Sequence, residues 1–248
     1  MKKLYILLLI VLLSSSLLAE EYDLTAANRA YQNQNYEKAA EEYLKTVDQG
    51  VMNFQLFYNL GNTYFKLNNL GYARLYYEKA AKFDPLDRDL RENLAMVKAN
   101  LKDKEVDQKS FFETVLQKII FSFSINVLAI LILVIFILLM ASIVLLIISK
   151  EGGLRNLSKI LIVILSCIFF ILVVMEIWRI RTFYAKDTAI ILDETVIAYS
   201  GPSQDFQQVF TIHEGLKVTI ERFDNDWVLI KLPSGNGGWV TQSSIGVI

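Results

Sequence analysis

Cysteine and histidine are almost absent from this chain, and their absence removes several classes of chemistry. The 248 residues include one cysteine, Cys167, and one histidine, His213. One cysteine cannot form an intramolecular disulfide or a cysteine-based metal site, and one histidine cannot supply a pair of imidazole ligands. A histidine-dependent triad is not expected, and the sequence has no phosphate-binding loop, nucleophile elbow or recognisable pair of catalytic carboxylates. We therefore expect no enzyme, no metal and no other cofactor.

Net charge is also nearly absent, whereas apolar residues are in excess. Lys and Arg number 25 against 26 Asp and Glu, and 54% of the chain is hydrophobic. That fraction is too high for a soluble globular domain and indicates membrane segments. Residues 187–248 carry three basic residues (Lys217, Arg222, Lys231) and eight acidic ones, so we expect no binding of nucleic acid.

The first apolar run follows Met1-Lys2-Lys3 and ends shortly before Ala19. A basic start, a short apolar stretch and a small residue before two acids are typical of a secretory signal peptide. We assign residues 1–19 to it. An uncleaved signal anchor is the alternative, because Leu17 is a poor residue for the position three before the cut.

Two longer apolar runs, 127–148 and 160–177, predict transmembrane helices at 126–149 and 160–178. The short segment between them, 150–159, makes the pair a hairpin, so both flanking parts of the chain lie on one side of the bilayer. Basic residues at the two ends are nearly balanced and do not decide the orientation. The signal peptide decides it: a multi-pass protein of a bacterial cytoplasmic membrane, with loop 150–159 cytoplasmic and both soluble domains periplasmic.

Small and aromatic residues recur at fixed spacing before the hairpin, at Phe57, Leu60, Gly61, Tyr64, Ala73, Tyr77, Ala80 and Pro85. This is the register of a tetratricopeptide repeat, a two-helix unit of 34 residues. A weaker copy precedes it, with Ala39 in the place of Ala73. We therefore predict repeats at 20–53 and 54–87, followed by a capping helix within a domain that spans 20–108.

Repeats of this class bind partners in a groove lined by the first helix of each unit. At that register we find Asn28, Tyr31, Asn59, Asn62, Phe65, Lys66 and Asn93. Asparagine can pair with peptide groups as donor and acceptor, so the residues predict peptide binding. A clamp for a C-terminal carboxylate is not expected, because Leu24 and Asp89 stand where cations are needed. The alternative is that the asparagines are solvated or cap turns.

The last part of the chain, 187–248, alternates as half-buried strands do and has regular turns, which predicts a small all-β barrel. Its residues Tyr199-Ser200-Gly201-Pro202-Ser203, Asp226-Trp227-Val228 and Gly237-Gly238-Trp239-Val240 resemble the bacterial SH3 domain. The resemblance implies a ligand site near Tyr199, Trp227 and Trp239.

The predicted architecture is multidomain: an all-α tetratricopeptide array, a transmembrane hairpin and a small SH3-like barrel. This order resembles the BatE family of the Bacteroides aerotolerance operons. The resemblance implies a membrane-anchored scaffold for protein–protein interaction. Its partners would be membrane proteins with von Willebrand factor A domains and, indirectly, a MoxR-type AAA+ ATPase, with a role in stress tolerance or envelope assembly. The alternative is a membrane-anchored module that binds peptidoglycan peptides.

Overall fold

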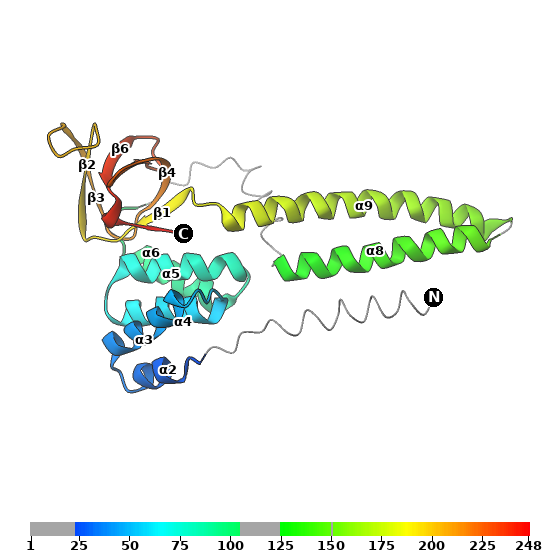
Figure 1. Ribbon diagram of the computed structural model, residues 1–248, viewed down its shortest axis with the longest axis horizontal. Helices are drawn as coiled ribbons and strands as arrows, with labels where there is room; N and C mark the ends of the chain where they lie inside the picture. Colours follow the sequence, from blue (N-terminus) through cyan, green and yellow to red (C-terminus); the bar gives the residue numbers. More distant parts are fainter. Residues whose placement is uncertain (1–22, 105–124, 150) are drawn as a thin grey trace. The chain divides into compact units, whose positions relative to one another are not determined.

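The computed structural model describes residues 23–104, 125–149 and 151–248 (Figure 1). The predicted signal peptide lies outside these ranges. The chain divides into two compact units, Met1–Met52 and Asn53–Ile248.

The first unit contains one helix pair, α2 (Thr25–Gln32) and α3 (Tyr36–Asp48). Small buried side chains lie where the helices meet, namely Ala27 and Ala30 of α2 and Ala39 of α3. They allow the two backbones to come close together. The Tyr43 hydroxyl of α3 donates a hydrogen bond of 2.6 Å to Asn28 Oδ1 of α2.

The second unit begins with three helices, α4 (Phe54–Lys66), α5 (Leu70–Phe83) and α6 (Arg88–Asn100). Each is preceded by a residue whose side-chain oxygen accepts a bond from the backbone N–H three residues later: Asn53, Asn69 and Asp87. Such caps satisfy N–H groups that have no partner within the helix. The pair α4–α5 falls within the predicted repeat 54–87, and α6 takes the place predicted for the capping helix.

Gly61 lies at the closest approach of α4 and α5. A Cβ atom at this position would overlap the ring of Tyr77. Around this contact Leu60, Ala73 and Ala80 are fully buried. The absence of a side chain at Gly61 is therefore a packing requirement of the repeat.

Two long apolar helices follow, α8 (Ile125–Ile148) and α9 (Gly153–Tyr184), and they lie side by side (Figure 1). Both are long and apolar enough to cross a membrane, by length and composition, over Val127–Ile148 and Gly153–Tyr184. The second helix is longer than the predicted span 160–178, since residues 153–159 and 179–184 are also helical.

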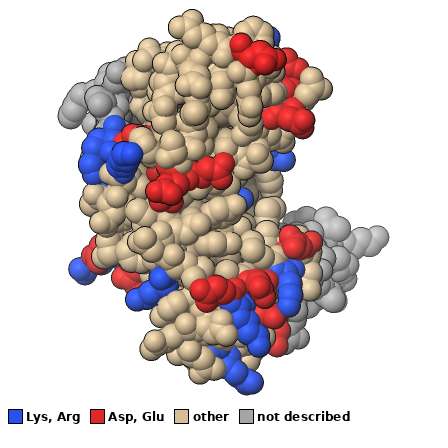
Figure 2. All heavy atoms as spheres, turned by 90° about the vertical axis from the view of Figure 1, so that its left-hand side faces the viewer, with Lys and Arg blue, Asp and Glu red and all other residues tan. Residues whose placement is uncertain are grey.

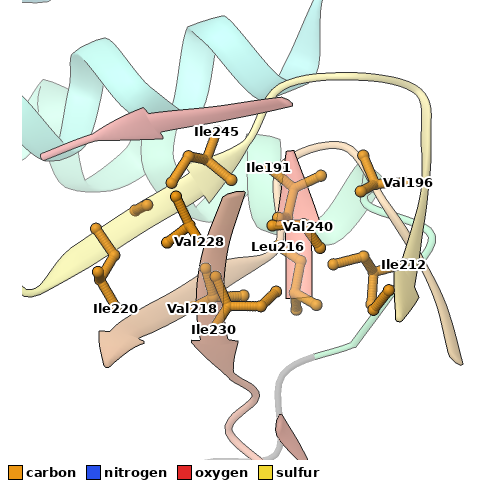
Figure 3. Packing of buried hydrophobic residues seen from close by; sticks show 12 residues of the cluster. Ile191, Val196, Ile212, Leu216, Val218, Ile220, Val228, Ile230, Val240 and Ile245 are labelled. Carbon is orange, nitrogen blue, oxygen red and sulfur yellow. The ribbon is translucent and has the colours of Figure 1, made fainter. Parts of the chain in front are cut away.

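The chain ends in a seven-stranded antiparallel sheet with the order β3-β2-β6-β5-β4-β1-β7. The strands are β1 (Thr188–Ile191), β2 (Thr195–Tyr199), β3 (Gln208–His213), β4 (Lys217–Asp224), β5 (Trp227–Lys231), β6 (Gly237–Thr241) and β7 (Ile245–Val247). Aliphatic side chains from all seven strands gather in one core, as Figure 3 shows. Val228, Ile230 and Val240 are fully buried in it.

The all-β class and the antiparallel pairing agree with the sequence prediction, but the sheet does not close into the predicted SH3-like barrel. The strands β3 and β7 stand at the two ends of the order and are not paired with each other. Only one residue pair, Tyr199 with Trp239, joins β2 to β6. The β2–β6 pairing, which joins β2 and β3 to the other five strands, is therefore short.

Candidate functional site

Two of the predicted groove residues, Asn62 on α4 and Asn93 on α6, lie within one polar network. The Asn62 carboxamide oxygen accepts a hydrogen bond of 2.7 Å from the Tyr77 hydroxyl and one of 3.0 Å from Asn93 Nδ2. Asn93 Nδ2 also lies 3.2 Å from the Tyr58 hydroxyl. The network ties α4, α5 and α6 together, so Asn62 and Asn93 contribute to the packing of the repeat.

The bond between Asn62 and Tyr77 has an equivalent in the first unit. Asn28 and Tyr43 stand 34 residues earlier than this pair (62 − 28 and 77 − 43), and they form the same hydrogen bond. In both helix pairs a tyrosine of the second helix is held by an asparagine of the first. The sequence contains this signal, a pair that recurs at the repeat period, which the prediction of Asn28 and Asn62 as groove residues did not use.

The other predicted groove residues of the second unit lie on α4. Asn59 Oδ1 accepts a bond of 2.9 Å from Gln55 Nε2, one turn earlier on the same helix. Phe65 is half-buried and Lys66 is exposed. We call the surface formed by Asn59, Phe65 and Lys66 the α4 face; it offers an amide, an apolar ring and a cation to a partner. Tyr31 belongs to the first unit, where its ring packs edge-on against Tyr36 at 5.3 Å.

The opposite helix of the repeat, α5, is joined to the sheet by a contact that the sequence analysis did not predict. We call it the α5 junction. Arg74 is fully buried, and its Nη1 donates a hydrogen bond of 2.6 Å to the Gly215 carbonyl. The backbone N–H of Gly71 donates to Glu214 Oε2 at 3.0 Å. A Cβ at Gly71 would lie 2.9 Å from the Ile191 carbonyl oxygen, so glycine is what lets α5 approach the strand.

Glu78 is the central acid of the α5 junction. Its carboxylate lies 2.9 Å from Lys217 Nζ of β4, 3.6 Å from Arg74 Nη2 and 3.9 Å from Lys98 Nζ of α6. Burial by itself would raise the pKa of Glu78, but the charges of Lys217, Arg74 and Lys98 outweigh it and lower that pKa to about 2. The carboxylate therefore stays ionised and joins three elements through charge-assisted contacts.

Lys82, one turn further along α5, joins the helix to the end of α9. Its Nζ donates to the carbonyls of Phe183 at 2.9 Å, Ala185 at 3.1 Å and Ile248 at 3.0 Å. Next to it the rings of Phe83 and Phe183 meet edge-on, with centroids 5.0 Å apart. The repeat, the apolar helix and Ile248, which directly follows β7, thus meet at one side chain.

A further tie between the helices and the sheet involves the one histidine. His213 is the last residue of β3. In the structure its backbone N–H and its Nδ1 contact the Asp103 carboxylate at 2.7 and 3.1 Å. Its Nε2 lies 2.7 Å from Lys102 Nζ. His213 therefore holds the segment after α6 against the end of β3.

The three aromatic residues implied by the SH3 resemblance lie close together on the sheet. Tyr199 pairs with Trp239 across β2 and β6. The Tyr199 ring meets Trp227 edge-on at 5.7 Å. The Arg222 guanidinium lies 4.9 Å from the centroid of the Trp239 ring. We call these three aromatics and Arg222 the sheet aromatic cluster; Trp239 is buried within it, while Tyr199 and Trp227 are half-exposed.

Charge does not gather into one basic field on the visible surface. On the face shown in Figure 2, acidic and basic side chains are scattered among uncharged ones. Within the described residues, no group of three or more His, Cys, Asp or Glu side chains is arranged to hold a metal ion.

Comparison with known families identifies the class of the central helices. Residues 54–87 match the tetratricopeptide repeat family, and the match covers α4 and α5. No curated protein matches the chain. Residues 54–87 therefore form a tetratricopeptide repeat, a module of the protein–protein interaction class, in a chain with two helices apolar enough for membrane anchoring.

Proposed function

We propose that this chain is a membrane-anchored scaffold that binds another protein through the α4 face and performs no catalysis. The observation that supports the proposal is that the two helices of the repeat 54–87 differ in their surroundings. The α5 helix is engaged by the sheet and by the end of α9, through Arg74, Glu78 and Lys82. The α4 helix carries the partly exposed amide, ring and cation that suit an extended peptide.

The α5 junction also supports the hairpin topology. Helix α5 precedes α8 in the chain, and β1 follows α9, yet both belong to one compact unit and contact each other. If α8 and α9 span a bilayer, this contact requires that repeat and sheet lie on the same side. We propose that this side is the periplasm of a bacterium and that α8 and α9 cross the cytoplasmic membrane.

The partners follow from the order of the regions, which resembles the BatE family. We propose membrane proteins with von Willebrand factor A domains as direct partners and a MoxR-type AAA+ ATPase as an indirect one. The role would be stress tolerance or assembly of envelope complexes.

A second candidate function is the binding of peptidoglycan peptides by an SH3-like C-terminal domain. The observation that favours it is the sheet aromatic cluster, in which Tyr199 and Trp227 are half-exposed and in ring contact. Paired aromatic rings supply rigid apolar area to a ligand.

The two candidates are separated with variants of the full chain in detergent. A triple variant, Asn59→Ala, Phe65→Ala and Lys66→Ala, changes the α4 face and leaves the network of Asn62 intact. We expect it to lower capture of a co-expressed von Willebrand factor A domain protein at least tenfold, while Trp227→Ala retains capture. Sedimentation with purified peptidoglycan gives the converse test. If Trp227→Ala abolishes both capture and sedimentation while the triple variant keeps both, the scaffold proposal is wrong and the sheet is the binding site.

Topology is tested separately with reporter fusions. Alkaline phosphatase placed after Ile248 should be active, and a fusion between α8 and α9 should be inactive. The reverse result would place repeat and sheet in the cytoplasm.

A further inference from the structure

The turn between α5 and α6 is held beside the end of the longer apolar helix. Besides the three bonds from Lys82 Nζ, the Arg179 guanidinium of α9 donates to the Lys82 carbonyl at 3.4 Å. Phe83, the last residue of α5, contacts Phe183. The turn starts at the next residue, so residues 84–87 cannot move far from the end of α9.

The height of this contact along α9 follows from helix geometry. The apolar run Ile160–Ile177 is about 27 Å long at 1.5 Å per residue, so a hydrocarbon core of about 30 Å extends to about Arg179. Phe183 lies four residues further, about 6 Å beyond the core. The polar layer on each side of the core is about 5–7 Å thick. The contact between Phe83 and Phe183 is therefore at the level of the lipid headgroups.

Exposed apolar and aromatic side chains gather at this level. Leu86, in the turn, is 49% exposed, and Trp178 and Tyr184 of α9 are 39% and 70% exposed. Trp and Tyr are the side chains that favour the membrane interface. The neighbouring Arg181 and Lys186 are exposed cations, which attract anionic headgroups.

The acids of the turn do not oppose this placement. Asp84 Oδ1 accepts the backbone N–H of Leu86 at 3.0 Å, and Asp87 Oδ1 accepts that of Leu90 at 2.8 Å. Both carboxylates are thus turned to the backbone, and the apolar side chain at the tip is Leu86.

We propose that the α5–α6 turn is a second membrane contact, in which Leu86 enters the lipid interface beside α9 while Arg181 and Lys186 bind headgroup phosphates. The occupant of this surface is the lipid bilayer. The inference rests on the proposed membrane anchoring by α8 and α9 and adds that the repeat lies against the membrane. A repeat that lies against the membrane holds the α4 face at a fixed distance from the bilayer surface.

The test places an environment-sensitive fluorophore on single cysteines in the full chain. The background is Cys167→Ser, which removes the only native cysteine. The purified protein is reconstituted in vesicles of phosphatidylcholine and phosphatidylglycerol, with spin labels either at the headgroup or deep in the acyl chain. The probe at Leu86→Cys should show blue-shifted emission and severalfold stronger quenching by the headgroup spin label than by the deep one.

A matched control is Val209→Cys, which is 50% exposed and lies on β3, at the opposite end of the strand order from β1 and β7. The emission of its probe should be that of a fluorophore in water, and neither spin label should quench it. If the Leu86→Cys probe behaves in the same way, the inference is wrong. It is also wrong if that probe is blue-shifted but unquenched by either lipid, because a protein surface then covers it.

A third probe, at Ile137→Cys near the centre of α8, separates this inference from the anchoring on which it rests. Ile137 is 56% exposed, and its probe should be quenched by the deep spin label. If it is not, α8 does not span the bilayer and both proposals fail. If it is quenched while the Leu86→Cys probe reports water, anchoring stands and the second contact alone is overturned.

Discussion

The two helix pairs at 25–48 and 54–83 share an internal bond but differ on the outer side of the second helix. Each pair is held by a tyrosine of the second helix that donates to an asparagine of the first. Where α5 has Gly71, Arg74 and Glu78, α3 has Glu37, Ala40 and Leu44 at the positions 34 residues earlier. The core positions preserve the repeat, and three outer positions decide that α5 becomes a junction with the sheet.

The comparison shows that the same backbone unit can carry different external roles. Glycine at position 71 permits close approach of α5 to β1. Arg74 donates to the Gly215 carbonyl in the turn between β3 and β4, and Glu78 lies beside three cations. On α3, Glu37 and Lys45 are exposed, and Lys45 pairs with Glu42 on the same helix. If the α5 junction stabilises the fold as its burial implies, removing its charges should lower the free energy of unfolding more than removing the exposed pair on α3.

The largest effect is expected from Glu78→Ala. The change removes the Glu78 carboxylate from the buried Arg74, and breaking a buried ionic contact in this way costs about 3–5 kcal/mol. The measurement is the free energy of unfolding of the full chain in detergent. The control is Glu42→Ala on α3, whose pair with Lys45 is solvent-exposed and contributes about 0.2–1 kcal/mol. Equal losses for the two variants would contradict the assigned role of the junction.

A pH dependence of similar origin follows for the same group. The pKa of Glu78 is about 2 in the folded chain against an ordinary 4.5, so its ionised form is favoured by folding. This contribution is complete above pH 4.5 and is lost as the pH falls towards 2. Its upper limit is about 3 kcal/mol, because each pH unit between 4.5 and 2 corresponds to about 1.4 kcal/mol.

The difference between the wild type and Glu78→Gln isolates this contribution from that of other carboxylates. The two unfolding free energies should converge as the pH is lowered from 5 to 2. A difference that stays constant over this range would show that the Glu78 carboxylate is not preferentially ionised in the folded chain.

A smaller effect is expected from Gly61→Leu, in the interior of the repeat. The added side chain would meet the Tyr77 ring, and overpacking of this kind costs about 1–3 kcal/mol. Thermal unfolding of the full chain checks it. Ala26→Leu, at an exposed position of α2, is the control and should change stability little. An unchanged Gly61→Leu protein would disprove the close approach of α4 and α5.

The smallest effects compare an asparagine that joins helices with one that is bonded along its own helix. Asn62→Ala removes the oxygen that accepts bonds from the Tyr77 hydroxyl and the Asn93 amide, at a cost of about 1–3 kcal/mol. Asn59→Ala removes a bond to Gln55 on the helix surface and should cost below about 0.5 kcal/mol. Chemical denaturation of both variants checks the order. If Asn59→Ala cost more stability than Asn62→Ala, Asn62 would not have the packing role assigned to it.

Much of the fold could be read from local patterns. The register from Phe57 to Pro85 predicted a repeat that the family match confirms at 54–87. The two apolar runs predicted the helices α8 and α9, and the alternation after Asp187 predicted the antiparallel strands. Each pattern depends on neighbours within one element or one repeat, so the sequence displays it directly. The closure of the sheet depends on pairing between distant strands, and that prediction went further than the structure supports.

The α5 junction could not be read in the same way. Arg74 and Glu78 are four residues apart on one helix, which ordinarily indicates a solvated ion pair. Their partners Gly215 and Lys217 lie about 140 residues away along the chain, and the separations are 141 for Arg74 and 139 for Glu78. His213 is similar, since the residue it contacts, Asp103, is 110 positions earlier. The residues next to a charged side chain on a helix do not show whether it is exposed to solvent or buried against a distant part of the chain.

Local sequence patterns are therefore sufficient for the repeat, the two apolar helices and the β-class of the C-terminal region, because hydrophobic periodicity and residue size act over short distances. The burial of Arg74, the ionisation of Glu78 beside three cations and the bonds from Lys82 to the end of α9 become visible only in the folded chain. These outcomes depend on which distant surfaces exclude water from the charges, and burial of that kind arises only when the chain is folded.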